Sequence, residues 1–94
     1  MNRVALTDMS GKWFDQDRVQ GEWDSSGNWN DINVLRQTLY LSANGVWIMQ
    51  FVPTRDREVM TYEAITAEKA AHWLIANDHD LPDTLVTEAA KSEV

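Results

Sequence analysis

The feature that most constrains the fold is a pair of apolar segments joined by an Asn-Gly turn. The first segment, Val34 to Leu41, is dense in Val, Leu, Thr and Tyr, which favour strands. Asn44-Gly45 tolerates the positive φ angles of a tight turn, and the chain then returns over residues 46–52. This second segment is apolar on both faces, so it is predicted to be central in a sheet and covered on both sides. Together the two segments predict an antiparallel hairpin.

A third strand is predicted to follow the hairpin. Pro53 lacks an amide donor and should end the second strand. Glu58 to Ile65 then alternates, with Met60, Tyr62 and Ala64 sharing a face. The expected sheet is a three-stranded antiparallel meander over about residues 33–65.

Two helices are expected after the sheet. The hydrophobic period changes at Thr66, a good N-cap, and predicts a helix over about residues 67–76. Pro82 suits the start of a second helix, over about residues 83–90. The first helix is predicted to cover one face of the sheet through a stripe of small and aliphatic residues, Ala70, Ala71 and Leu74.

The segment before the sheet fits two structures. Trp13-Phe14 could form a short strand, or an apolar staple before a helix capped by Asp15. Val19 and Trp23 are four residues apart, which favours one face of a helix, although Gly21 weakens it. We therefore expect a short N-terminal helical segment.

These elements predict an α+β fold with one domain over residues 1–94. Residues 1–10 and 91–94 are expected to be flexible. The sheet face away from the helices is expected to carry part of an apolar set; if nothing in the chain covers it, that face implies a homodimer or a partner. The set is Trp47, Met49, Phe51, Met60 and Tyr62.

The charge of the chain disfavours several classes of partner. Its 94 residues carry a net charge of −7, which opposes direct binding of nucleic acid or of an anionic membrane. Residues 1–31 hold three basic and six acidic side chains, and residues 66–94 hold two and six, around a neutral middle. These flanks are either a solvated surface or an acidic face for a basic partner.

Cysteine is absent, which excludes disulfides and thiolate sites. No apolar run is long enough to span a membrane. A cytoplasmic protein is expected.

Tryptophan is unusually frequent, with five in the chain. Large rings either fill the core of a small domain or form a platform for a base, a sugar or a protein partner. Trp29 lies in a stretch of Gly, Asn, Ser and Asp without apolar neighbours, which suits an exposed role. The candidate binding residues are Trp23, Trp29, Trp47, Phe51 and Tyr62.

Catalytic and metal-binding patterns are weak. The loop from Asp24 to Asp31 alternates oxygen-bearing side chains, but Trp29 and Leu35 stand where a calcium loop needs Gly and Glu. His72 and His79 are the only imidazoles, fewer than a zinc site requires. There is no phosphate-binding Gly-rich loop and no nucleophile motif. We therefore expect no enzyme, no catalytic residue, no metal and no cofactor.

The order of the apolar motifs resembles that of a group of small, uncharacterised bacterial proteins associated with mobile or accessory genes. The resemblance covers roughly residues 13–77, supports the α+β fold and implies no catalytic activity. It is carried by Phe14-Asp15, Val19, Trp23, Gly27-Asn28, Leu39-Tyr40, Gly45-Val46-Trp47-Ile48, Tyr62-Glu63-Ala64-Ile65-Thr66 and Ala70-Ala71-His72-Trp73-Leu74.

These observations favour a small acidic, non-enzymatic protein-interaction module. A sharper version, suggested by the mobile-gene association, is an accessory protein or inhibitor whose acidic flanks occupy a nucleic-acid-binding surface. The alternative is a module that binds a sugar or base through exposed tryptophans.

Overall fold

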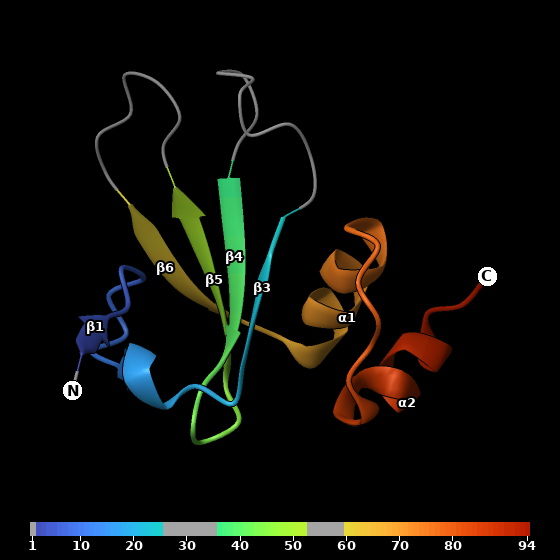
Figure 1. The fold of residues 1–94 in the computed structure, drawn as a ribbon, viewed down its shortest axis with the longest axis horizontal. Coiled ribbons are helices and arrows are strands. Elements are labelled where there is room, and N and C mark those ends of the chain that lie inside the picture. Colours follow the sequence, from blue (N-terminus) through green and yellow to red (C-terminus); the bar gives the residue numbers. More distant parts are fainter. Residues whose placement is uncertain (1, 26–35, 53–59) are drawn as a thin grey trace.

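A four-stranded antiparallel sheet forms the centre of the computed structural model, which describes residues 2–25, 36–52 and 60–94 (Figure 1). The strands lie in the order β3-β4-β5-β6, each antiparallel to the next. The predicted three-stranded meander is therefore wrong. The strands are β3 (Gly21–Asp24), β4 (Arg36–Leu41), β5 (Trp47–Val52) and β6 (Thr61–Ile65).

The additional strand, β3, comes from the segment predicted to be helical. Its burial alternates with period two, and Trp23 pairs with Leu39 of β4. A helix would place Val19 and Trp23 on one face, but here they pack on opposite faces of the sheet. A Cβ on Gly21 would collide with the Trp23 ring, so a glycine is needed beneath this indole. Gly21, which would weaken a helix, thus allows close packing of Trp23 in a strand.

The hairpin of β4 and β5 is confirmed. The two strands pair in register from Arg36 opposite Val52 to Leu41 opposite Trp47. In the turn, Gly45 takes a φ of 82° and its amide donates to the Ser42 carbonyl at 3.0 Å. The prediction that β5 is central is also confirmed, because it lies between β4 and β6 with apolar residues packed on both faces.

Two helices cover one face of the sheet: α1 (Ala67–Ala76) and α2 (Asp83–Lys91) (Figure 1). Thr66 caps α1 as predicted, because its hydroxyl accepts a hydrogen bond from the Lys69 amide at 3.2 Å. The residues buried between sheet and helices are Leu39, Leu41, Trp47, Met49, Ala70, Ala71, Trp73, Leu74 and Leu85.

The opposite face is covered by the N-terminal segment. Strands β1 (Arg3–Ala5) and β2 (Trp13–Asp15) form a two-stranded sheet, the N-terminal hairpin, followed by a 3₁₀ turn, Gln16–Arg18. The face of the central sheet beneath it is the hairpin-covered face, and the opposite one is the helix-covered face. Of the set predicted to contribute to the hairpin-covered face, Tyr62 packs on it, whereas Trp47, Met49 and Phe51 point to the helices. The buried residues under β1 and β2 are Leu6, Phe14, Tyr40 and Ile48. The chain thus covers this face itself, and the expectation of a dimer formed through it loses its basis.

Both edges of the sheet carry capping contacts. Along β6, the Thr7 amide donates to the Tyr62 carbonyl at 2.8 Å, and the Tyr62 amide donates to the Thr7 hydroxyl at 2.9 Å. On β3, the Asp24 carbonyl accepts from His79 Nε2 at 2.6 Å, so that nitrogen carries the proton. Glu22 adds an exposed charge to the same strand. Such features disfavour edge-to-edge pairing with another sheet.

Candidate functional site

Three of the five predicted binding residues lie on the helix-covered face. Trp47 is 6% exposed and belongs to the core, while Trp23 and Phe51 are half-buried against it. The rings of Trp23 and Trp47 lie 5.6 Å apart. This arrangement places Trp47 in the packing between sheet and helices rather than on a surface platform.

The other two predicted residues lie elsewhere. Tyr62 is on the hairpin-covered face, with its ring 5.9 Å from that of Phe14. Trp29 lies outside the described residues, as does most of the loop from Asp24 to Asp31 that was compared with a calcium-binding loop. The five residues therefore do not form one site within the described part of the chain.

A buried polar cluster lies beside Tyr62. The Tyr40 hydroxyl donates to Gln50 Oε1 at 2.7 Å and accepts from Gln16 Nε2 at 3.2 Å. Burial raises the pKa of Tyr40 above its usual value, and that of Tyr62 as well. Both hydroxyls therefore stay protonated near neutral pH and act as hydrogen-bond donors rather than as bases.

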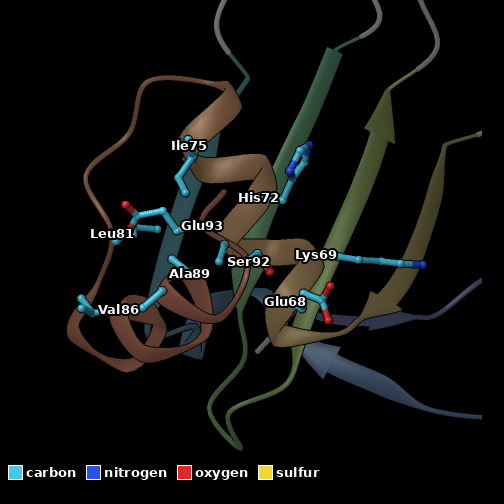
Figure 2. Close-up of a pocket in the computed structure, with 11 residues that line it drawn as sticks. Glu68, Lys69, His72, Ile75, Leu81, Val86, Ala89, Ser92 and Glu93 are labelled. Atoms are coloured by element: carbon cyan, nitrogen blue, oxygen red, sulfur yellow. The ribbon is translucent and has the colours of Figure 1, made fainter.

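One candidate surface is a groove along α1 and α2. It encloses a cavity of about 820 Å³, lined by both helices and by the segment between them (Figure 2). Drug-sized ligand pockets span roughly 300–1,000 Å³, so the groove is large for a chain of this length. Its lining is mainly apolar: Ala71, Ile75, Leu81, Val86, Ala89 and Ala90, with Glu68, Lys69, His72, Ser92 and Glu93 around them.

Helical spacing explains which residues of α1 line the groove. The stripe buried against the sheet includes Ala70 and Leu74, and the adjoining face carries Glu68, His72 and Ile75 at spacings of four and three residues. Ile75 is 55% exposed, although it follows a fully buried leucine. Its side chain lies on the side of α1 toward α2 in Figure 2.

The residues of α2 that line the groove also lie beside a residue buried in the core. Leu85 is buried and fixes α2 against the core, which turns Val86, Ala89 and Ala90 toward the groove at helical spacing, while Glu93 lines it from the segment after the helix. Val86 is 52% exposed. One leucine therefore holds the helix while the next residue remains open to solvent.

The charge around the groove is acidic. Glu68, Lys69 and Glu93 are the charged residues of the lining, and the Glu68 and Lys69 side chains both extend from the side of α1 away from α2 (Figure 2). On α2, Lys91 is engaged by Glu88 at 3.3 Å. With six acidic and two basic residues over 66–94, this end of the molecule is negative.

The two histidines lie in different surroundings. His72 lines the groove, while His79 stacks on Trp73, with ring centroids 5.8 Å apart. Among residues 2–25, 36–52 and 60–94, no group of three or more His, Asp or Glu side chains could hold a metal ion. In the same ranges, no helix has the length and apolarity needed to cross a membrane.

Comparisons of the chain with family models, with curated proteins and with solved structures gave no match. The resemblance to small bacterial proteins therefore stays a prediction.

The groove is not among the sequence predictions, because the apolar spacing of the first helix is explained by burial of one face against the sheet. Ile75 shares the three- and four-residue spacing of the buried stripe, so spacing alone does not separate it from Leu74. The available signal was the second periodic set at Val86, Ala89 and Ala90. Two adjacent helices with apolar residues beyond their core-facing stripes indicate a groove between them.

Proposed function

We propose that this chain is a small, non-enzymatic protein-interaction module that binds an amphipathic helical segment in the groove between α1 and α2. The observation that carries the proposal is the exposure of Ile75 and Val86 beside an apolar cavity. Isolated exposed aliphatic residues are ordinary, but two that line one concave surface form a docking surface.

The dimensions of the groove suit a helix. Helix α1 has 10 residues, so it is roughly 15 Å long at 1.5 Å per residue. A partner helix of about three turns could lie along it and insert apolar residues at i, i+3, i+4 and i+7. The small side chains of Ala71 and Ala89 leave room for larger ones from the partner.

The charge selects the partner. Glu68 and Glu93 flank the apolar lining, so lysine or arginine on the polar flanks of the bound helix would meet opposite charge. A second copy of this chain, with the same negative surface, is less suited. The accessory or inhibitor role suggested by the resemblance fits this proposal, because an acidic module could cover a basic segment. The cytoplasm is the compartment we propose, on the sequence grounds given above.

Designed peptides test the proposal directly. A fluorescently labelled Leu/Lys peptide of about 14 residues with helical periodicity should bind, and a Leu/Glu peptide of the same pattern should bind at least about ten-fold more weakly. A scrambled Leu/Lys peptide keeps the charge and loses the apolar face. Equal binding of the scrambled and patterned peptides would contradict the proposal.

Substitutions in the groove test whether the peptide binds there. Replacing both Ile75 and Val86 by Gln preserves helix propensity and should weaken binding by about ten-fold or more. Met9→Gln, at a position 95% exposed and far along the chain, is the matched control and should bind normally. Light scattering after size exclusion adds a second outcome. A salt-resistant dimer broken by the Gln pair would place a second copy in the groove and overturn the proposed partner.

A further inference from the structure

A second cavity lies on the other side of the sheet, between the N-terminal hairpin and the β4–β5 turn. It has a volume of about 500 Å³, within the usual range for small-molecule sites of roughly 300–1,000 Å³. Its lining shares no residue with the helix groove. The cavity is therefore independent of the function proposed above.

The floor of this cavity is apolar. Leu6, Phe14 and Ile48 are all buried and belong to the core under the hairpin. Trp13 also lines the cavity, and its side chain is 56% exposed. The Arg3 guanidinium lies 5.2 Å from the centre of the Trp13 ring, a cation–π contact that restrains the indole.

The opposite rim is a structured turn. The Ser42 hydroxyl accepts a hydrogen bond from the Val46 amide at 3.0 Å, and Gly45 closes the turn. Ser42 and Asn44 thereby bring polar side chains to the rim. An aromatic wall, an apolar floor and a polar rim are the usual parts of a small-ligand site.

The cavity is locally cationic in an acidic protein. Lys12 and Arg18 both line it, and within the described residues neither forms a salt bridge. Asp15 is the acidic residue of the lining and attracts Arg18. However, its carboxylate already accepts hydrogen bonds from the Asn2 and Asp17 amides, at 3.1 and 3.0 Å. The amide of Asn2 is the largest cause of its lowered pKa. Two cations therefore stand beside one carboxylate that is held by the backbone.

We propose that this cavity binds a small aromatic anion. The flat ring would lie over the apolar floor against Trp13, and its carboxylate or phosphate would pair with Lys12 and Arg18. Charge-assisted hydrogen bonds of this kind are stronger than neutral ones and select anions. A nucleic-acid strand is disfavoured as the occupant, because the net charge of −7 repels a polyanion more than a small one.

Nuclear magnetic resonance titration of the full chain tests the proposal with matched probes. Indole-3-acetate is compared with the neutral indole-3-acetamide, and adenosine monophosphate with adenosine. At least one anion should bind about ten-fold more tightly than its neutral partner, an energy typical of one good charged contact. The two pairs separate a carboxylate ligand from a phosphate ligand. Signals of the Trp13 indole and of the Lys12 and Asn44 amides should shift.

Variants confirm the location. Lys12→Gln and Arg18→Gln should each weaken the anion by several-fold and leave the neutral probe unchanged, whereas Lys69→Gln in the helix groove should have no effect. Trp13→Leu should weaken both members of a pair. Because Trp13 is exposed, this change should leave the thermal unfolding midpoint close to that of the wild type. Equal affinities for anion and amide, shifts confined to the helix groove, or no binding at millimolar concentration would each overturn the proposal.

Discussion

The helix-covered face of the sheet is lined by aliphatic and aromatic side chains, whereas the hairpin-covered face combines apolar residues with a buried hydrogen-bonded cluster. On the first face, Leu39 and Leu74 are fully buried in a large core. On the second, Gln50 is buried and depends on Tyr40 for a hydrogen bond. The same two strands, β4 and β5, supply both faces by alternation.

This difference has consequences for stability. Apolar burial is non-directional and is lost only when α1 and α2 leave the sheet. A buried polar cluster stabilises only while each donor and acceptor is paired, so it depends on geometry and on pH. We therefore expect the hairpin-covered face to open before the helix-covered face.

The largest expected effect is on the helix-covered face. Leu39→Ala should lower the free energy of unfolding by about 2–5 kcal/mol, because it leaves a cavity beneath α1. Leu6→Ala, under the two-stranded sheet, should cost less, about 2 kcal/mol, because that sheet can move inward. Urea unfolding followed by circular dichroism measures both changes. Equal losses would remove the distinction between the two faces.

The polar cluster should give the next effect and a pH signature. Tyr40→Phe leaves the side chains of Gln50 and Gln16 each without one hydrogen bond, which should cost about 1–3 kcal/mol at pH 7. Since the pKa of Tyr40 is raised on folding, its contribution is complete below the unfolded value of about 10 and is lost as the pH rises through the folded value.

Unfolding measured between neutral and alkaline pH sharpens this prediction. Stability of the wild type should fall above about pH 10, and the fall should be smaller in Tyr40→Phe. Leu39→Ala is the control, because it lowers stability without removing a titrating group. If the alkaline slopes of the wild type and Tyr40→Phe coincide, Tyr40 does not titrate as its burial requires.

A smaller effect is expected at the start of α1. Thr66→Ala removes the acceptor for the Lys69 amide and should cost about 1 kcal/mol. Thr66→Ser keeps the hydroxyl and should therefore retain most of the stability that Thr66→Ala loses. Thermal unfolding of the three proteins measures the difference, and no loss in the Ala variant would mean that packing alone holds the helix.

The smallest effect should appear at acid pH on the N-terminal hairpin. Hydrogen bonding by the Asn2 amide lowers the pKa of Asp15, so its contribution is present above the unfolded value of about 3.9 and is lost as the pH falls through the folded one. In Asp15→Asn, the free energy of unfolding should fall slightly less on acidification than in the wild type. Glu22→Gln, on the exposed edge of β3, controls for net charge.

Strong local signals explain what could be predicted. The β4–β5 hairpin follows from two apolar runs around Asn44-Gly45, and the α1 cap follows from Thr66 before a helical period. Strand β3 could not be found in this way. Val19 and Trp23 have helical spacing, and only pairing with β4 shows that they serve opposite faces of the sheet.

The candidate sites show the same limit. The aromatic content of the sequence favours Trp47 as a binding residue. In the structure its ring is buried between the sheet and the helices, because it lies on a central strand that is covered on both faces. The helix groove depends on how α2 docks through Leu85, which no short spacing in the sequence specifies. The cationic cavity joins Lys12 and Arg18 to the β4–β5 turn, residues that are far apart along the chain.

The sequence by itself determined the elements whose signal lies within a few residues: the central hairpin, the capped α1 and the acidic flanks. Tertiary structure decided the role of residues 2–25, where most apolar runs are too short to show a period and the helical spacing of Val19 and Trp23 does not correspond to the strand that forms. Strands β1 and β2 have three residues each, too short to be stable alone. They form because Phe14 and Leu6 bury surface against Tyr40 and Ile48 of the completed sheet, a gain that exists only once that sheet is present.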